Sequence, residues 1–563
     1  MLWQHDYAPV SGSLALSAVA AGLPILVLFL MLGVWRRPAW MSALAGLGSA
    51  LVVALAVYGM PVQLAVRSTL LGAAYGIFPI AWVVFSSIML YRLAVDTGKF
   101  EVIKDSVGSL TDDRRLQAIL IAFSFGAFIE GAAGFGAPVA VSGAMLAGLG
   151  FNPFYAAGVC LLANTAPVAF GSIGIPVITL ANVTGLPLMP LSAMVGRLCA
   201  MVSIIIPGYL IVVMAGRARA LEVLPAIVAC GVSFAGMQLF MSNVMGPELT
   251  DIASSLSCII VMVAVLKLWK PKRIMRLEDD RPVTAAVKTH SPGEIFAAWL
   301  PYLLLVVFVL AWGEPRIKSA IDTWTNGLLP SWLPTNPRTL NGLNVPGLHN
   351  AITRMPPVTP APAPYAAVFV FNWLSASGTA CMLAMLAAAV FMRVKPSQLV
   401  KTYTATFRQL SFAMITIASM LGLAYLMNYS GMTSTLGLAL ASSGRAFPFF
   451  SAVVGWLGVF LTGSDTSANA LFGNLQVVTA RALDLNPILT ASVNSAAGVM
   501  GKMISVQSIA VAVAATGMTA ADESGLFRFT LKHSVALMVV MGILSMLFAY
   551  VVPGWVPTVE PLK

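Results

Sequence analysis

The sequence predicts an all-α polytopic membrane protein with about twelve spanning helices, two re-entrant hairpins and two repeats of inverted topology. Three observations predict this fold: the composition, a series of long apolar runs, and an internal repeat. Of the 563 residues, 59% are hydrophobic and only 9% are charged. A soluble domain has about 25% charged residues. The chain therefore lacks the charge needed to cover a water-exposed surface of its size.

Apolar runs of spanning length occur along the whole chain. A spanning helix needs about 20 mostly apolar residues. Ten runs fit: 13–34, 39–58, 70–93, 190–214, 219–241, 250–269, 292–312, 364–392, 406–428 and 533–553. The first lacks the flanks of a cleaved signal peptide, so we interpret it as a membrane helix. Two longer stretches, 117–184 and 449–516, are apolar but too rich in Gly, Pro, Asn and Ser for plain helices.

The net charge of +11 indicates topology rather than a nucleic-acid partner, because the basic residues lie in short connections between apolar runs. The main clusters are Arg36–Arg37, Arg92 to Arg115, Arg217 with Arg219, Lys270 to Arg276, and Arg393 to Arg408. All five are cytoplasmic together only if the N-terminus is external. The C-terminus is then also external, and residues 313–363 form a long external loop.

The two irregular stretches resemble each other. The sequence F-G-A-F-I-E-G at 125–131 has a counterpart in L-G-V-F-L-T-G at 457–463, and Asn152-Pro153 returns as Asn486-Pro487. The offsets are nearly constant, at about 332–334 residues. Because the charge rule gives the matched spans opposite directions, the repeats are predicted to be inverted, which is typical of secondary transporters. We expect repeat one at 10–215, linking helices at 219–269 and repeat two at 290–555.

Within each repeat, glycines, prolines and polar residues interrupt the apolar sequence twice. Repeat one is predicted to have a hairpin at 117–150, with its tip near 130–138, and a broken helix at 155–184. Repeat two is predicted to have a hairpin at 449–484, with its tip at 462–469, and a broken helix at 487–516. Irregular backbone at membrane depth is tolerated only inside protein or beside a cavity. The free N–H groups of a broken helix attract an anion.

The polar residues at these breaks are the candidate site. Burying a charge in lipid costs at least about 2.5–3.5 kcal/mol, so a charge at depth suggests function. Glu130 is the first candidate for proton coupling and Asp465 the second, although either can instead be structural. Lys502 pairs either with a substrate carboxylate or with one of these acids. The residues predicted to bind a small anion are Lys502, Asn164, Thr165, Ser464, Thr466, Asn494, Ser495, Ser505 and Gln507.

Several motifs resemble those of the L-lactate permease family. They are F-G-A-F-I-E-G-A-A-G-F-G-A-P-V-A at 125–140, Y-A-A-G-V-C-L-L-A-N-T-A-P-V-A-F-G-S-I-G-I-P at 155–176, G-P-E-L-T-D-I-A-S-S-L at 246–256 and G-K-M-I-S-V-Q-S-I-A-V at 501–511. In the last motif Val506 stands where we expect Pro. The resemblance covers almost the whole chain. It implies import of L-lactate, D-lactate and glycolate with protons across a bacterial cytoplasmic membrane.

Other functions have less support in the sequence. An enzyme is not expected, because the chain has no H-E-x-x-H or G-x-S-x-G motif. The four histidines show no metal-ligand spacing, so neither a metal nor another cofactor is expected. A passive anion channel and a sodium-coupled carboxylate symporter stay open as alternatives. In the second, oxygen atoms at 462–469 would bind Na⁺.

Overall fold

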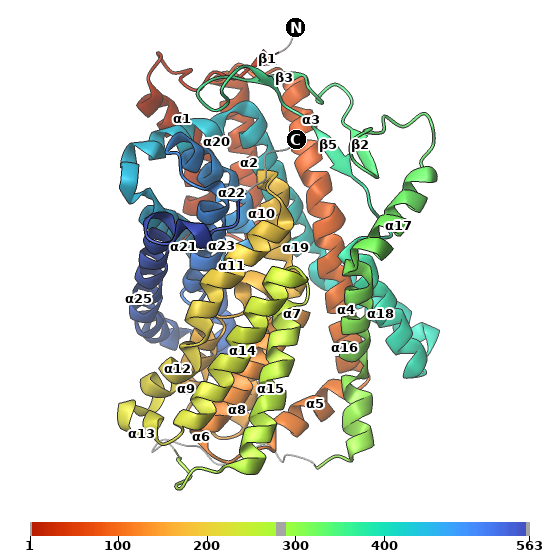
Figure 1. The fold of residues 1–563 in the computed structure, drawn as a ribbon, viewed down its shortest axis with the longest axis vertical. Helices are drawn as coiled ribbons and strands as arrows, with labels where there is room; N and C mark the ends of the chain where they lie inside the picture. Colours follow the sequence, from red (N-terminus) through yellow and green to blue (C-terminus); the bar gives the residue numbers. More distant parts are fainter. Residues whose placement is uncertain (1–2, 135, 277–288, 559–563) are drawn as a thin grey trace.

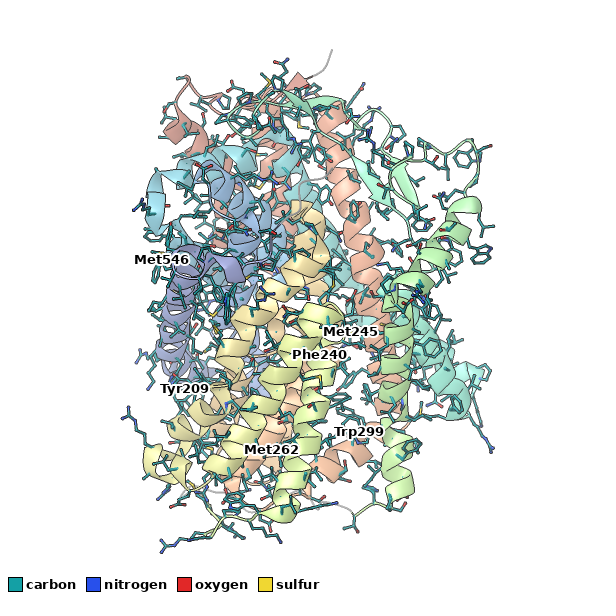
Figure 2. The ribbon with its side chains drawn as sticks, in the orientation of Figure 1. Tyr209, Phe240, Met245, Met262, Trp299 and Met546 are labelled. Carbon is teal, nitrogen blue, oxygen red and sulfur yellow. The ribbon has the colours of Figure 1, made fainter. Side chains whose placement is uncertain are left out.

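The computed structural model describes residues 3–134, 136–276 and 289–558. It is almost entirely helical, and the predicted all-α membrane fold is confirmed. Among the described residues, 12 helices are long and apolar enough to cross a membrane. Large apolar side chains such as Phe240 and Met245 point outward from the bundle, 55% and 40% exposed (Figure 2). Such a surface suits lipid rather than water.

The first part of the chain contains helices of spanning length and the first hairpin (Figure 1). Its helices are α1 (Leu14–Phe29), α2 (Ala39–Ala56), α3 (Val62–Tyr75), α4 (Trp82–Asp96), α5 (Lys99–Gly108), α6 (Arg114–Gln117), α7 (Gly126–Ala132), α8 (Ala137–Gly148), α9 (Pro153–Ala163), α10 (Gly171–Thr184), α11 (Leu188–Ser203), α12 (Ile206–Ala215), α13 (Arg217–Leu221), α14 (Leu224–Val244) and α15 (Thr250–Leu268). The π-helical segments η1 (Leu30–Val34), η2 (Gly76–Ala81) and η3 (Ala118–Phe125) extend or join neighbouring helices.

The second part of the chain begins after the segment that follows α15 and includes an extended insertion between α17 and α18. Its helices are α16 (Pro292–Gly313), α17 (Pro315–Gly327), α18 (Ser377–Phe391), α19 (Pro396–Ser430), α20 (Met432–Leu440), α21 (Phe447–Thr462), α22 (Asp465–Ala482), α23 (Pro487–Lys502), α24 (Val506–Thr516) and α25 (Glu523–Tyr550). Short 3₁₀ turns are η4 (Val168–Phe170), η5 (Ala441–Ala446), η6 (Ala520–Asp522) and η7 (Pro553–Trp555).

Five short strands cover one end of the molecule, where the N-terminus lies (Figure 1). They are β1 (Trp3–Gln4), β2 (Gly342–Asn344), β3 (Ile352–Arg354), β4 (Ala363–Pro364) and β5 (Val368–Val370). Strand β1 pairs parallel to β3, which pairs antiparallel to β4. Strands β2 and β5 pair antiparallel, with Leu343 opposite Phe369. The predicted span at 364–392 is therefore wrong in its first third, which pairs as strand and leaves a helix of only 15 residues, Ser377–Phe391.

The two irregular stretches form helical hairpins followed by interrupted helices. In the first hairpin, α6, η3 and α7 lead to a turn and α8 returns, so that the Arg114 guanidinium stacks 4.9 Å above the ring centre of Phe151. Residue 135 of the predicted tip lies outside the described residues. In the second, α21 and α22 meet at Gly463 (φ +70°). The first arm of the first hairpin, Arg114–Ala132, is long and apolar enough to cross a membrane, and α21 reaches that length together with α20 and η5, over Met432–Thr462, whereas the sequence predicted two re-entrant hairpins.

The breaks after the hairpins differ in sharpness. Helix α9 and the segment Val168–Thr184 are bent by 62°. Helices α23 and α24 are separated only by residues 503–505, and Val506 occupies the first helical position of α24. Proline favours that position because its missing N–H is not needed there. The break is thus made by the Ser505 cap without a proline. The inverted relation and the repeat boundaries remain predictions.

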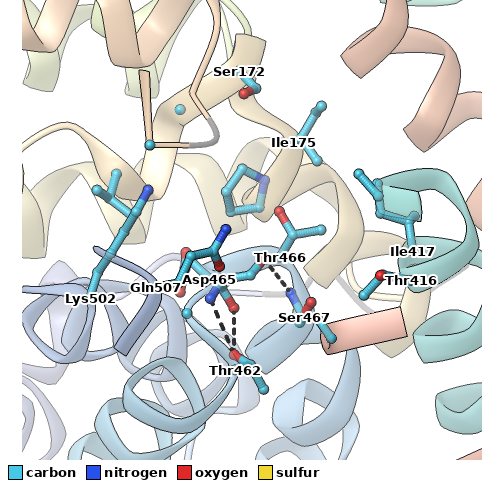
Figure 3. A pocket seen from close by; sticks show the side chains of 18 of the residues that line it. Ser172, Ile175, Thr416, Ile417, Thr462, Asp465, Thr466, Ser467, Lys502 and Gln507 are labelled. Carbon is cyan, nitrogen blue, oxygen red and sulfur yellow. Dashed lines mark hydrogen bonds between the residues drawn. The ribbon is translucent and has the colours of Figure 1, made fainter. Parts of the chain in front are cut away.

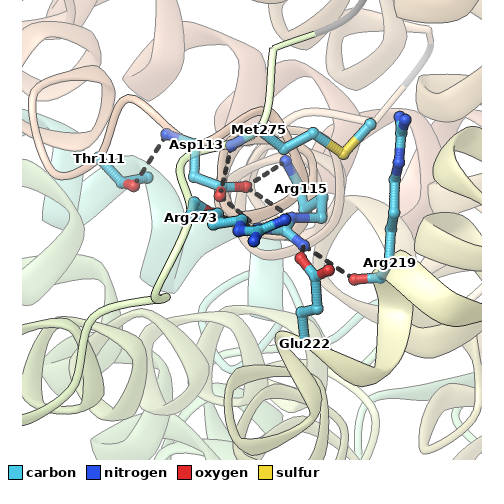
Figure 4. Close-up of polar contacts among 7 residues, drawn as sticks. All are labelled: Thr111, Asp113, Arg115, Arg219, Glu222, Arg273 and Met275. Atoms are coloured by element: carbon cyan, nitrogen blue, oxygen red, sulfur yellow. Dashed lines mark hydrogen bonds and ion pairs between the residues drawn. The ribbon is translucent and has the colours of Figure 1, made fainter.

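At the end of the molecule opposite the strands, a buried ion-pair network links three segments of the chain (Figure 4). The Arg115 side chain is fully buried and pairs with Asp113 at 2.7 Å and with Glu222 at 2.7 Å. It also donates to the backbone carbonyls of Arg219 and Arg273, both at 2.9 Å. One guanidinium therefore joins the start of the first hairpin to α13 and to the segment after α15.

Candidate substrate site

A cavity of about 290 Å³ lies where the two hairpin tips and the two broken helices meet (Figure 3). Its lining includes the starts of four helices, α8 at Gly136, α10 at Gly171–Ser172, α22 at 464–467 and α24 at 507–508. The first N–H groups of a helix have no partner within the helix, and the N-terminal end carries a partial positive charge. Four such ends around one cavity favour an anion.

The start of α10 has an unusual backbone. Ser172, Ile173 and Gly174 all adopt left-handed conformations, with φ of 46°, 61° and 72°. A β-branched residue such as Ile173 rarely adopts this conformation. The turn brings the Ser172 hydroxyl to the carbonyl of Ala133 in the first hairpin, which accepts its hydrogen bond at 2.9 Å. This hydrogen bond joins the broken helix to the hairpin tip, and it requires the strained left-handed backbone at residues 172–174.

Glu130 and Lys502 form an ion pair at the cavity. The Lys502 ammonium, at the end of α23, lies 3.1 Å from Glu130 Oε1 on α7, and the two side chains are 11% and 3% exposed. The carboxylate fits because residue 171 is glycine, since a Cβ there would come within 2.5 Å of Glu130 Oε1. Only Glu130 Oε1 is paired; Oε2 has no hydrogen-bond partner among the described residues.

Asp465 lies at the other hairpin tip, as the first residue of α22. Its Oδ2 accepts hydrogen bonds from the Ser495 hydroxyl at 2.6 Å and from the Asn469 amide at 3.4 Å. Asn469 also donates to the carbonyl of Pro176 at 3.1 Å, which ties the second hairpin to α10. Asp465 is only 3% exposed, yet it lines the cavity.

The structure separates the predicted site residues into three groups. Ser464, Thr466 and Gln507 line the cavity together with Lys502, Glu130 and Asp465. Asn164 and Thr165 lie beside Lys502 along a separate narrow gap, which Ser508 also lines.

The third group, Asn494, Ser495 and Ser505, is buried next to the cavity without lining it. Asn494 and Ser495 are fully buried, and Asn494 donates to Asn469 Oδ1 at 2.9 Å. Ser505 caps α24 by accepting from the Ser508 N–H at 3.2 Å.

The wall opposite these polar groups is mainly apolar. It consists of Ala39 and Trp40 at the start of α2, and of Phe412, Ala413, Thr416 and Ile417 in the middle of α19. Trp40 and Phe412 stack with ring centres 5.5 Å apart. The polar contacts for a ligand thus come mainly from the hairpins and broken helices, and the opposite wall closes the cavity with apolar surface.

Comparison with known proteins identifies the family. The model of the L-lactate permease family matches residues 17–552. The chain belongs to the L-lactate permease family. It is 47% identical over 569 residues to the L-lactate permease of Bacillus subtilis (strain 168), with 99% of this chain and 100% of that protein covered. It is 42% identical to the glycolate permease GlcA of Escherichia coli (strain K12), with 98% and 99% covered.

Among solved structures, the MtrF structure of Neisseria gonorrhoeae aligns with a TM-score of 0.44 and 11% identity, covering 85% of this chain and 83% of that one. The family assignment made from the sequence motifs is confirmed by the family match. This permease family member is therefore a multi-pass membrane protein.

Sequence reasoning missed several groups at the site. Ser172, Thr462, Ser467 and Ser508 line the cavity but were not singled out. Their position next to the predicted glycine and proline breaks was the available signal. Asp251, in the first turn of α15, is 1% exposed and packs behind Glu130 against Gly131. It was missed because an acid at the start of an apolar run usually marks a membrane surface.

Proposed function

We propose that this permease family member imports L-lactate and related 2-hydroxymonocarboxylates, such as D-lactate and glycolate, together with protons. One observation carries the proposal: four helix N-termini and the Lys502 ammonium surround a single cavity, and Lys502 is already paired with a carboxylate. A carboxylate ligand suits this set of donors. The substrate names come from the relatives, whose printed names are L-lactate permease and glycolate permease.

The Glu130–Lys502 pair supports a coupling mechanism. The carboxylate that pairs with Lys502 in the structure is Glu130, 3.1 Å away. A proton on Glu130 removes its charge and frees Lys502 for the substrate carboxylate. The empty site and the fully loaded site are then both neutral, whereas either half-loaded site keeps an unpaired buried charge. Because an unpaired buried charge is costly, only the two neutral forms change conformation readily.

The remaining predicted residues take supporting positions in this proposal. Ser464, Thr466 and Gln507 hydrogen bond the substrate, including its 2-hydroxyl. Asp465 is the second protonatable group, held by Ser495 and Asn469. Asn164, Thr165, Asn494 and Ser505 hold the backbone around Lys502 and the second hairpin. In this proposal the protein lies in the bacterial cytoplasmic membrane, with both termini and the loop 313–363 on the external side. The repeats 10–215 and 290–555 have opposite orientations in the membrane, and the cavity lies between them.

The test is Glu130→Gln in proteoliposomes, with uptake of labelled L-lactate driven by an imposed pH gradient. The glutamine keeps the shape but cannot carry the proton, so lactate no longer accumulates against its gradient. Glu101→Gln is the matched control, because Glu101 is exposed and, among the described residues, its ion-pair partner is Lys104 on α5. Accumulation by Glu130→Gln at the wild-type level would show that another group carries the proton. Accumulation that follows external Na⁺ at fixed pH would show sodium coupling instead.

A further inference from the structure

A second buried acid, Asp251, packs against the first hairpin at the residue after Glu130. Asp251 is 1% exposed, and neither of its carboxylate oxygens has a hydrogen-bond partner among the described residues. An ionised carboxylate without donors is costly to bury, so the neutral acid, which carries a proton, fits this position. The charged groups whose fields reach Asp251 are Glu130 and Lys502, and the Cys199 thiol also lies within range.

Asp251 packs on the backbone of the first hairpin. A Cβ on Gly131 would lie 2.8 Å from the Cβ of Asp251, so the two segments touch at the residue that follows Glu130. Glu130 Oε2 also has no partner among the described residues, while Oε1 holds Lys502. Two buried carboxyl groups therefore have unoccupied oxygens on adjoining segments, which suits proton transfer between them.

A second cavity lies beside Glu248, which precedes Asp251 by three residues in the chain. It has a volume of about 30 Å³ and is lined by Glu248, Lys318, Ser375 and Ser377, among others. That space is enough for a water molecule. Ser377 donates to Glu248 Oε1 at 3.4 Å. The cavity lies at the end of α16 and the start of α18, which flank the long insertion predicted to be external.

The segment between the two cavities is short and fixed. Glu248 and Asp251 are three residues apart at the start of α15. A Cβ on Gly174 would come within 2.7 Å of the Pro247 backbone, so this segment packs against the left-handed turn of α10. Glu248 thus lines the second cavity, and Asp251, three residues later, packs against the hairpin at the residue after Glu130.

We propose that Glu248 and Asp251 form a proton route from this second cavity to Glu130, separate from the path of the organic anion. The proposal rests on the proposed proton symport. Asp251 transfers its proton to the Glu130 carboxylate and is then reprotonated by Glu248, which in turn takes a proton from hydronium in the cavity water. At each step one O–H bond breaks as the next forms, and no electrons are transferred. Separate routes let the proton reach Glu130 while the substrate cavity is closed on that side.

The test compares two transport modes of Asp251→Asn in proteoliposomes. Uptake driven by a pH gradient needs net proton transfer, whereas exchange of internal for external lactate at equal pH does not. We expect driven uptake to fall about 100-fold or more, as for loss of a positioned proton carrier, while exchange continues. The exposed Asp112→Asn is the matched control and changes neither mode.

Two results would overturn the route: driven uptake by Asp251→Asn at the wild-type level, or equal loss of uptake and exchange. Glu248→Gln, at a position less buried than Asp251, provides a second variant. It must show the same selective loss of driven uptake, to a smaller extent because water in the cavity reaches Asp251. If the wild-type protein itself shows no uptake driven by pH, the proposed symport fails rather than the route.

Discussion

The close fit of Glu130 against Gly171 gives a sharp test of the ion pair. Gly171 has φ −60° and ψ 156°, which alanine adopts without strain, so Gly171→Ala changes only the space beside Glu130. The added Cβ would lie 2.5 Å from Glu130 Oε1 and 3.1 Å from its Cγ. The carboxylate must therefore retreat by about 1 Å. That movement disturbs its contact with Lys502, which lies 3.1 Å away.

Overpacking of this kind costs about 1–3 kcal/mol. If the wild-type arrangement is needed for transport, the cost lowers kcat/KM for lactate by about 5- to 150-fold, at 1.4 kcal/mol per tenfold change. The assay is initial uptake of labelled lactate at several external pH values, normalised to the amount of protein in the membrane. Gly48→Ala is the control, since Gly48 is in the middle of α2 with nothing within 4 Å of an added Cβ.

The pH dependence of uptake distinguishes loss of the Glu130–Lys502 ion pair from a general loss of folded protein. Once Glu130 has moved away, Lys502 is available to the substrate without protonation of Glu130. The pH dependence of lactate uptake must therefore become shallower in Gly171→Ala but not in Gly48→Ala. Uptake by Gly171→Ala within about twofold of the wild type, with an unchanged pH profile, would refute the role assigned to this pair.

Two further predictions concern stability, measured as thermal unfolding of the purified protein. Arg115→Ala leaves the buried Asp113 without its cationic partner, and we expect a loss of about 3–5 kcal/mol, against under about 1 kcal/mol for the partly exposed Lys104→Ala. Burial lowers the pKa of His5 to about 4, with its Nε2–H donating to the carbonyl of Tyr429 at 2.8 Å. Between pH 6.5 and 4 the unfolded chain binds a proton at this residue that the folded chain does not. The free energy of unfolding therefore decreases as the pH is lowered from 6.5 to 4, by up to about 3 kcal/mol relative to His5→Gln. An equal pH response in the two proteins would contradict the burial of His5.

The sequence allowed prediction of those parts of the site where the backbone itself is irregular. Glycines and prolines at 131–138 and 171–176, and polar residues at 462–469, marked the hairpin tips and breaks because they are unsuited to plain spanning helices. Lys502 and Glu130 stood out because charges are rare in apolar runs. Their pairing across 372 residues of sequence was one of several open choices.

Other parts could not be predicted because their role depends on packing between distant segments. The wall formed by α2 and α19 has ordinary apolar residues, and nothing in their sequence distinguishes them from residues that face lipid. The strands at 363–370 lie within an apolar run whose length alone suggested a helix. Asp251 was missed because an acid at the start of an apolar run is expected at the membrane surface, whereas the start of α15 is buried inside the bundle.

Under the proposed symport, the charge balance of the buried site sets the coupling ratio. Within the described residues, Glu130, Asp251 and Asp465 are the acids whose charges act together at this point, and Lys502 is the cation that acts on them. One ammonium neutralises one carboxylate, so the other two acids are accommodated as neutral, protonated groups. When the substrate carboxylate replaces Glu130 at Lys502, the displaced Glu130 must in turn take a proton. On this proposal one proton accompanies each substrate anion, because one lysine serves two competing carboxylates.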